Sequence, residues 1–488
     1  VVVANPSLFL SAELTLTSRT GDPVPLLGDT TLIPPAVYQL GSKTTVRSAV
    51  LEGIREVERI DPNADRVTLG PGRSAVLLME PGNTQSPKFL ESTQPVVAYQ
   101  FSPYCCNFTA TNDASILLPT PSLGSRYRVI GYPTWVFFED PEDPAPSNII
   151  TPYFYVVGTS EEPTEVDVTS PVPLVAGATY GGTVVSSSSR NHSFTLARGE
   201  VRVLSAVGRS TYDPPRDADF SGAVVDADHP VAVFTGHPCT FVPQRNWACD
   251  HLEEQMIPAQ ALGSSYVLQP LRRRGDAQRS FETTYWRITP DADAELTFSP
   301  PLTELQVSEP STPFTPDCRS FLNEDGVAVL RAGEVCEFGS RSVLAVDSTE
   351  ELVVAGVLSG HESTGVLTYG TRAGDPALFL APPIDQYRDS YAFVTPPTFA
   401  KTYISVVVPQ DTPVELDGRF IPRGRKLELR TVEANGRAWE TFSVILEAGA
   451  HSLSSSRRFG LVVYAYDDFV SYAFPGGLDL APTKQARP

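Results

Sequence analysis

The chain has 488 residues, enough for three or four domains of ordinary size, and its 41% hydrophobic content is that of a folded protein. Its 57 acidic and 37 basic residues give a formal net charge of −20. This charge argues against a nucleic-acid partner, which would require a basic face to displace counterions. No apolar run approaches the roughly 18 residues of a membrane-spanning helix, so no membrane span is predicted.

Four strongly apolar strands recur along the chain in the same context. They begin at Gln94, His229, Glu351 and Phe459 and read QPVVAYQFSPYC, HPVAVFTGHPC, ELVVAGVLSGHES and FGLVVYAYDDF. A weaker strand with a Gly-centred turn precedes each, and a tyrosine-containing strand follows the first three. At spacings of about 110 to 135 residues each repeat is long enough to bury its own core, so the repeats are predicted to be modules.

The repeated strands are short, alternate in polarity and are bounded by Gly, Pro, Asn or Asp. This pattern predicts an all-β fold of about four tandem antiparallel β-sandwich-like modules. The expected boundaries give modules at 1–120, 121–261, 262–385 and 386–488. A closed, propeller-like ring of sheets is the alternative architecture. The apolar segment 1–17 would either complete its own first sheet or add to a sheet edge of a neighbouring subunit.

Six cysteines are present, and none has the C-x-x-C spacing of zinc or redox sites. Cys239 and Cys249, and likewise Cys318 and Cys336, are close enough in sequence to form local disulfides. The adjacent Cys105 and Cys106 would either bond to each other or find separate partners. An even cysteine count, with a first residue that is not Met, leads us to expect an exported protein at the cell surface or outside the cell.

The second repeat carries a more specific pattern, PVAVFTGHPC followed after nine residues by CDHLEEQMIPAQALGSSYVLQPL. It resembles the N-terminal domain family of IgGFc-binding protein, specifically over 222–275 and diffusely over about 95–395. The residues that carry the resemblance are Pro230, Val231, Gly236, His237, Cys239, Cys249, Asp250, His251, Glu254, Gln255, Pro258, Gly263 and Tyr266. It implies an extracellular, β-rich module of large secreted or surface assemblies, with no defined ligand.

The densest group of chemically active side chains lies in this same segment. It comprises Cys239, Asp250, His251, Glu253 and Glu254, with His237 nearby. As an enzyme it would be a His–carboxylate acid/base pair, and as a metal site two His and a carboxylate. We favour a structural interpretation, in which a disulfide holds a loop whose backbone Asp250 and His251 bind. No cofactor is predicted; Ca²⁺ is the alternative, although no D-x-D-x-D-G loop is present.

Two further segments are candidates for binding. The aromatics Tyr132, Trp135, Phe137 and Phe138 would form an interface patch if exposed, or would fill the joint between the first two modules if buried. The run Arg272, Arg273 and Arg274 is a basic spot on an acidic chain and would pair with an acidic face of a neighbouring subunit.

The sequence therefore supports three functional hypotheses. The first is a secreted, non-enzymatic structural or adhesive surface protein that assembles into filaments or a lattice. The alternative is a surface module that binds a carbohydrate or protein ligand. The third is an extracellular hydrolase or metal enzyme centred on His237, Asp250, His251 and Glu254. The expected partners are the chain itself, another cell-surface protein or a glycan, without nucleic acid.

Overall fold

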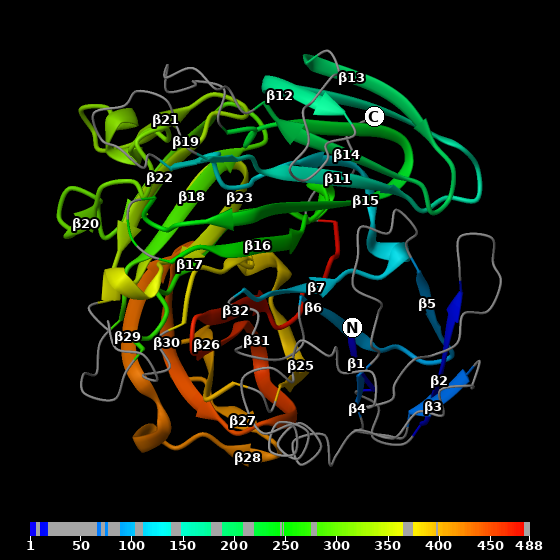
Figure 1. The fold of residues 1–488 in the computed structure, drawn as a ribbon. Helices are drawn as coiled ribbons and strands as arrows, with labels where there is room; N and C mark the ends of the chain where they lie inside the picture. Colours follow the sequence, from blue (N-terminus) through cyan, green and yellow to red (C-terminus); the bar gives the residue numbers. More distant parts are fainter. Residues whose placement is uncertain are drawn as a thin grey trace.

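The computed structural model describes residues 1–5, 10–17, 66–69, 74–76, 88–102, 111–137, 148–176, 188–207, 219–244, 246, 248–274, 281–364, 374–396 and 399–482. Over these ranges the chain consists of antiparallel β-strands with short 3-10 turns and no α-helix (Figure 1). The predicted all-β class is confirmed. Within the same ranges, no helix has the length and apolarity needed to cross a membrane.

Every sheet draws its strands from one stretch of the chain, which divides the strands into four units. The first unit contains β1 (Val2–Ala4), β2 (Ala12–Thr17), β3 (Arg66–Leu69), β4 (Ser74–Val76), β5 (Phe89–Ser92), β6 (Val97–Ser102) and β7 (Asp113–Leu117). The second contains η3 (Thr120–Ser122), β8 (Gly124–Arg128), β9 (Trp135–Phe137), β10 (Asn148–Ile150), β11 (Tyr153–Gly158), β12 (Thr164–Ala176), β13 (Ser189–Leu196), β14 (Val201–Ala206), β15 (Val224–Thr240) and β16 (Asp250–Gln255).

The third and fourth units likewise begin with a short 3-10 turn that a strand follows. The third contains η4 (Ala259–Ala261), β17 (Gly263–Leu268), β18 (Thr284–Pro290), β19 (Ala294–Ser299), β20 (Val307–Ser308), η5 (Cys318–Phe321), β21 (Ala328–Leu330), β22 (Cys336–Ser340), β23 (Leu344–Leu358), η6 (His361–Thr364) and β24 (Leu378–Leu380). The fourth contains η7 (Ile384–Gln386), β25 (Arg388–Thr395), β26 (Lys401–Pro409), β27 (Val414–Leu416), β28 (Arg419–Phe420), η8 (Arg423–Arg425), β29 (Leu427–Ala434), β30 (Arg437–Leu446), β31 (Gly449–Asp467) and β32 (Val470–Pro475).

One long strand in each of the last three units belongs to two layers of strands. In the third unit the first half of β23 pairs with β17 and β19, and its second half pairs with β18 and β24. Strand β15 of the second unit and strand β31 of the fourth likewise pair with different strands along their two halves. The first unit has two strands in its place, since β5 pairs with β2 while β6 pairs with β1 and β7. These strands are the apolar segments whose repetition marked the sequence.

Alternation of polarity sets the register of the outer strands. Along β12, the stretch 164–172 alternates strictly between buried and exposed residues. Because successive side chains of a strand point to opposite faces, this pattern places Val166, Val168 and Val172 in the core and the charged residues in water. The long strands are apolar on both faces where they run inside the molecule, as in Leu352–Leu358 of β23.

A tyrosine links the first strand of the last three units to the long strand. Tyr127 on β8, Tyr266 on β17 and Tyr391 on β25 are buried. Each donates its hydroxyl to a carbonyl of the long strand, which is that of Val231, Leu352 or Phe459 in turn. The phenol ring thus fills the core while its hydroxyl satisfies a buried backbone acceptor at the point where the strand passes between layers.

The four units surround a centre where their last strands meet. Strand β7 contacts β16, β16 contacts β24, β24 contacts β32, and β32 contacts β7. The contact between the fourth and first units is aromatic, because Phe101 packs edge-on against Tyr472 and Phe474 at 5.2 and 5.9 Å between ring centroids. We call each contact between units a seam. The two predicted architectures are therefore combined, with sandwich-like units closed into a ring.

The expected module boundaries fall close to three short turns. η3, η4 and η7 each follow a proline, and each is followed by the tyrosine-bearing strand. The division into separate domains at 120, 261 and 385 stays a prediction. The first strand, Val2–Ala4, pairs with β4 and β6 of its own unit, as the first of the two alternatives expected.

Candidate functional site

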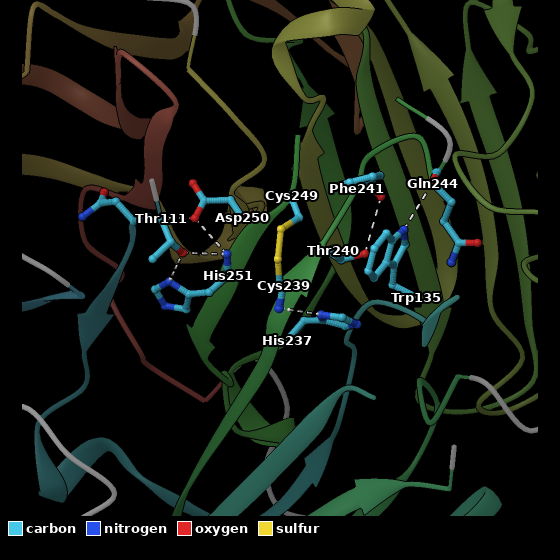
Figure 2. The surroundings of a disulfide bond; sticks show 11 residues. Thr111, Trp135, His237, Cys239, Thr240, Phe241, Gln244, Cys249, Asp250 and His251 are labelled. Carbon is cyan, nitrogen blue, oxygen red and sulfur yellow. Dashed lines mark hydrogen bonds between the residues drawn. A yellow bond between two sulfur atoms is a disulfide. The ribbon is translucent and has the colours of Figure 1, made fainter. Parts of the chain in front are cut away.

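The segment that resembles a known family spans the end of β15, a closed loop and strand β16 (Figure 2). Cys239 and Cys249 form a disulfide across this loop, and Cys318 and Cys336 form a second one in the third unit. Both predicted pairings are confirmed. Cys105 and Cys106 lie outside the described residues.

Contacts from two units hold the loop in place. Phe241 packs on Trp135 at 4.6 Å between ring centroids, and the Trp135 indole donates to the Gln244 carbonyl at 3.3 Å. From the third unit, the Gly360 amide donates to the Val242 carbonyl at 2.7 Å. The Gln244 amide in turn donates to the carbonyl of Ser311 at 2.9 Å. The disulfide loop therefore lies across the seam between the second and third units.

His237 is fully buried beside the disulfide. Its Nδ1 accepts the backbone N–H of Cys239 at 3.2 Å, and burial lowers the pKa of the imidazole to about 3. The preceding Gly236 is required by packing, since a Cβ there would lie 2.8 Å from the ring of Tyr153. His237 is a neutral hydrogen-bond acceptor in strand β15, where the register shifts between His237 and Thr240, and this agrees with the structural interpretation of this segment.

Polar side chains join β16 to β7 of the first unit. The two strands lie side by side, yet the sheet topology of the described residues gives them no shared backbone ladder. Instead Asp250 Oδ1 accepts the amide of Asn112 at 2.7 Å, and Gln255 Oε1 accepts the amide of Leu118 at 2.8 Å. In return Ser115 Oγ accepts the amide of Gln255 at 2.8 Å. Side chains of the family motif thus replace a β-ladder at this seam.

Asp113 connects three units through one carboxyl group. It accepts the amide of Ala114 at 2.9 Å in its own unit, that of Glu253 at 3.1 Å in the second and that of Leu378 at 3.0 Å in the third. The side chain is fully buried. Because a buried amide without an acceptor is costly, Asp113 fixes the positions of β16 and β24 around the centre.

The carboxyl groups at this seam hold protons more tightly than usual. Burial raises the pKa of Asp113, Asp250 and Glu254 well above the ordinary range. Mutual repulsion adds to the effect, since Asp113 is close to both Asp250 and Glu254. A protonated carboxyl can donate as well as accept, so these groups suit a structural network better than a charged ligand site.

Thr111, His251 and Glu253 form a line that superficially resembles a nucleophile, a base and an orienting carboxylate. Thr111 Oγ1 lies 3.3 Å from His251 Nδ1, and His251 Nε2 lies 3.5 Å from Glu253 Oε2. However, the Thr111 hydroxyl also accepts the backbone N–H of His251 at 3.0 Å (Figure 2). It is hydrogen-bonded to Asp250 as well. Its hydrogen-bonding capacity is used within the seam.

The predicted metal grouping is not assembled, and of the predicted acid/base grouping the structure brings together only His251 and Glu253. Figure 2 shows His237 and His251 on different sides of the disulfide, with Asp250 beside Thr111. Within the described ranges, no three His, Cys, Asp or Glu side chains are placed to hold a metal ion. His251 and Asp250 instead bind backbone and side-chain groups of the first unit.

Two of the aromatic candidates, Tyr132 and Trp135, are buried rather than exposed. Tyr132 and Trp135 are 1% and 7% exposed, and the Tyr132 hydroxyl pairs with Ser311 Oγ at 2.8 Å. They therefore fill the joint between the second and third units, not the expected one between the first and second. Phe137 lies in β9, and Phe138 lies outside the described residues.

The predicted basic run Arg272–Arg274 lies at the contact between the third and fourth units. Arg274 is 2% exposed, donates from Nε to Glu282 at 2.9 Å and lies 4.6 Å from the ring centroid of Tyr466 in the fourth unit. The backbone of Arg272 is hydrogen-bonded to the hydroxyls of Tyr464 and Tyr466. Arg273 donates to the carbonyl of Thr364 at 2.9 Å. Tyrosines of the fourth unit thus contact Arg272 and Arg274, whereas Arg273 is half-buried, and a contact of this run with a neighbouring subunit stays a prediction.

Sequence reasoning missed a buried ion cluster at the seam between the second and third units. Arg287 of β18 is fully buried and donates to Glu337 of its own unit and to Asp219 of the second unit. It also lies 5.5 Å from the ring centroid of Tyr132. The available signal was a single charge inside the apolar strand TYWRITP, since a buried charge requires a partner.

A family model described as IgGFc binding protein matches residues 113–465 of the chain. The chain belongs to the IgGFc binding protein family. The resemblance predicted from β15 and β16 is thereby confirmed, and it extends over the second, third and most of the fourth unit.

One relative in this IgGFc binding protein family is the human IgGFc-binding protein (Homo sapiens). It is 24% identical over 335 residues, which are 66% of this chain but only 5% of that protein. The chain thus spans a small part of its relative's length. A solved chain described as a membrane-anchored protein from Corynebacterium diphtheriae covers 82% of this chain and 96% of its own length at 10% identity. Its TM-score of 0.09 carries no argument about the fold.

Proposed function

We propose that this chain is an extracellular, non-enzymatic structural and adhesive module that holds another surface protein or a further copy of itself. The observation that supports this most directly is the use made of the family motif. Asp250, Glu254 and Gln255 direct their side chains to β7 and the residues on either side of it, so they hold the ring together. A motif that maintains a rigid scaffold is typical of a display or assembly module, whose contacts lie on its outer surface.

The membership of a binding-protein family gives the second support. The name of the human relative describes binding of IgG Fc, and that ligand is a property of the relative. What we carry over is the general class, a module that binds protein in an extracellular setting. The two disulfides fit this setting, because such bonds persist in oxidising compartments.

The proposal is tested by chemical cross-linking on the native surface or medium of the source organism, with the linked peptides identified by mass spectrometry. We expect cross-links from this chain to another surface protein or to a second copy. The matched control is the same reaction after reduction and unfolding, which abolishes specific contacts. A chain that gives no cross-links beyond this control, and that turns over a substrate in a hydrolase panel, would contradict the proposal.

A further inference from the structure

Basic side chains gather on one turn of the fourth unit. Arg419, Arg423 and Arg425 are exposed, and Phe420 between them is 66% exposed. In the part of the chain that the structure describes, none of these three guanidinium groups forms an ion pair. We call these four residues the basic patch.

The surroundings of the basic patch do not neutralise it. Lys426, the next cation, is already paired with Glu440, and Arg430 lies 3.9 Å from Glu428. Of the nearby carboxylates, Asp417, which directly follows β27, binds His451 at 3.0 Å, and Glu415 on β27 lies opposite Phe420. Arg425 donates to the carbonyl of Ile445 at 3.5 Å, but among the described residues none of the three arginines has a carboxylate partner. On a chain of net charge −20 they form a local excess of positive charge.

Carboxylates gather on the outer face of the second unit. Glu165 and Asp167 of β12 and Asp226 and Asp228 of β15 are all exposed, and we call them the acidic face. Asp167 lies directly opposite Asp226 in the antiparallel ladder. The amide of Glu165 donates to Asp228 Oδ1 at 2.9 Å, which places these two residues side by side as well. Like charges opposite each other destabilise a sheet.

The neighbours of the acidic face relieve this repulsion only on one strand. Asp226 binds Arg126 at 3.1 Å and Asp228 binds the Nδ1 of His229 at 2.9 Å. On β12, Asp167 accepts the hydroxyl of Ser193 at 2.5 Å, and neither it nor Glu165 has a cationic partner within the described ranges. The acidic face therefore has unused capacity for a cationic partner.

The two surfaces lie at opposite ends of the molecule. Strands β12 and β13 are at the top of Figure 1, whereas β27 and β28 are at the bottom. Two complementary patches at opposite ends of one chain cannot pair with each other in the same copy. Contacts between copies would be head-to-tail, and such contacts form open filaments unless the rotation closes a ring.

We propose that the basic patch of one copy binds the acidic face of a second copy, so that the module associates head-to-tail. The proposal rests on the proposed function and names its partner as a second copy of this chain. Each guanidinium presents a planar set of donors that matches a carboxylate, and Arg beside an exposed aromatic is a common composition of contact centres. Glu165 and Asp167 are the expected acceptors, because their charges are not otherwise neutralised.

The first test is sedimentation of the purified full chain over a range of concentrations. At low ionic strength the average mass is expected to rise above the monomer mass of 52.8 kDa, and to return to it near 1 M salt, where the screening length is about 3 Å. The variant Arg419→Glu/Arg423→Glu/Arg425→Glu is expected to bind at least about tenfold more weakly. The control Arg331→Glu/Arg341→Glu/Arg457→Glu makes the same change in net charge at other exposed arginines and is expected to associate like the parent.

A mixing experiment tests the head-to-tail arrangement. The variant Glu165→Gln/Asp167→Asn removes the charges of the acidic face and keeps the basic patch, and the triple arginine variant keeps the acidic face. Each alone should be monomeric, and an equal mixture should form dimers and stop there, because each dimer has used its only intact pair of surfaces. A mixture that behaves like its separate components would overturn the proposal, as would a parent chain that stays monomeric in low salt.

Two outcomes separate this inference from the proposed function. A monomeric parent chain that still cross-links to a different surface protein would leave the proposed function standing and remove the second copy as partner. A monomeric parent that binds an added sulfated polysaccharide through Arg419, Arg423 and Arg425 would assign the basic patch to a glycan, and would likewise overturn the inference.

Discussion

Tyr127 donates its buried hydroxyl to the backbone carbonyl of Val231 at 2.6 Å, joining the first strand of the second unit to its long strand. Tyr127→Phe removes the donor to this carbonyl and also the acceptor of the Gly124 amide, which lies 3.0 Å from the hydroxyl. We expect the free energy of unfolding to fall by about 1–3 kcal/mol, measured by urea denaturation.

Tyr387→Phe is the matched control for this prediction. Tyr387 is equally buried, but its hydroxyl has no hydrogen-bond partner among the described residues. Its removal is expected to change stability by less than about 0.5 kcal/mol or to increase it. Equal losses in both variants would show that the hydroxyl contact of Tyr127 has no special part in stability.

Asp113→Ala should loosen the centre of the ring. The change removes the acceptor of three backbone amides in three units, so we expect a loss of about 3 kcal/mol or more. Asp113→Asn keeps one acceptor oxygen and should lose less. Hydrogen exchange provides the local readout, because the amides of Glu253 and Leu378 should exchange faster in Asp113→Ala. Unchanged exchange at these two amides would contradict the role assigned to Asp113.

Arg287→Ala should be among the most damaging single changes at a seam. It leaves Glu337 buried without its cation, and breaking a buried pair in this way typically costs about 3–5 kcal/mol. The double variant Arg287→Met/Glu337→Gln removes both charges and is expected to recover part of the loss in thermal unfolding. The exposed pair of Arg319 with Asp317 is the comparison, and Arg319→Ala should cost less than about 1 kcal/mol.

Stability should fall in acid through His237. Its pKa is lowered to about 3 in the folded chain, whereas an unfolded histidine titrates near 6.5. Between these values the unfolded chain binds a proton that the folded chain excludes, so the contribution of His237 is present above about pH 6.5 and is lost as the pH falls toward 3. The slope is at most about 1.4 kcal/mol per pH unit.

The comparison with His237→Asn isolates this effect. Asn keeps an acceptor for the amide of Cys239 and does not titrate. Asp113, Asp250 and Glu254 act in the opposite direction, because their raised pKa values favour the folded chain at lower pH, so the difference between parent and variant is the quantity to measure. Parallel curves for the two proteins from pH 7 to 4 would argue against a buried neutral His237.

The alternation of polarity and the spacing of cysteines along the sequence were sufficient to predict the strands and the disulfides. Alternation around Val166 and Val168 specifies an outer strand, and the short separations of the two cysteine pairs specify their bridges. These features depend on residues close in sequence, where side-chain period and loop length act directly.

The seams could not be predicted in the same way. Tyr132 and Arg274 have the composition of a surface patch, and each is buried by a residue far along the chain, Ser311 in one case and Tyr466 in the other. Nothing in a local window distinguishes an aromatic at an internal joint from one at an external interface, because both require apolar surface with a polar rim. Asp113 was missed for the same reason, since two of its three partners belong to other units.

The four seams use unlike chemistry, and this limits how such a chain can change by recombination. Carboxyl-to-amide bonds join the first unit to the second, Arg287 with its carboxylates joins the second to the third, Arg274 against Tyr466 joins the third to the fourth, and aromatic rings close the circle. A unit that was deleted, duplicated or exchanged would bring together faces that do not match, leaving buried amides or charges without partners. Further copies of the repeat therefore cannot simply be inserted into the ring. Additional domains of such a protein would have to be attached outside it.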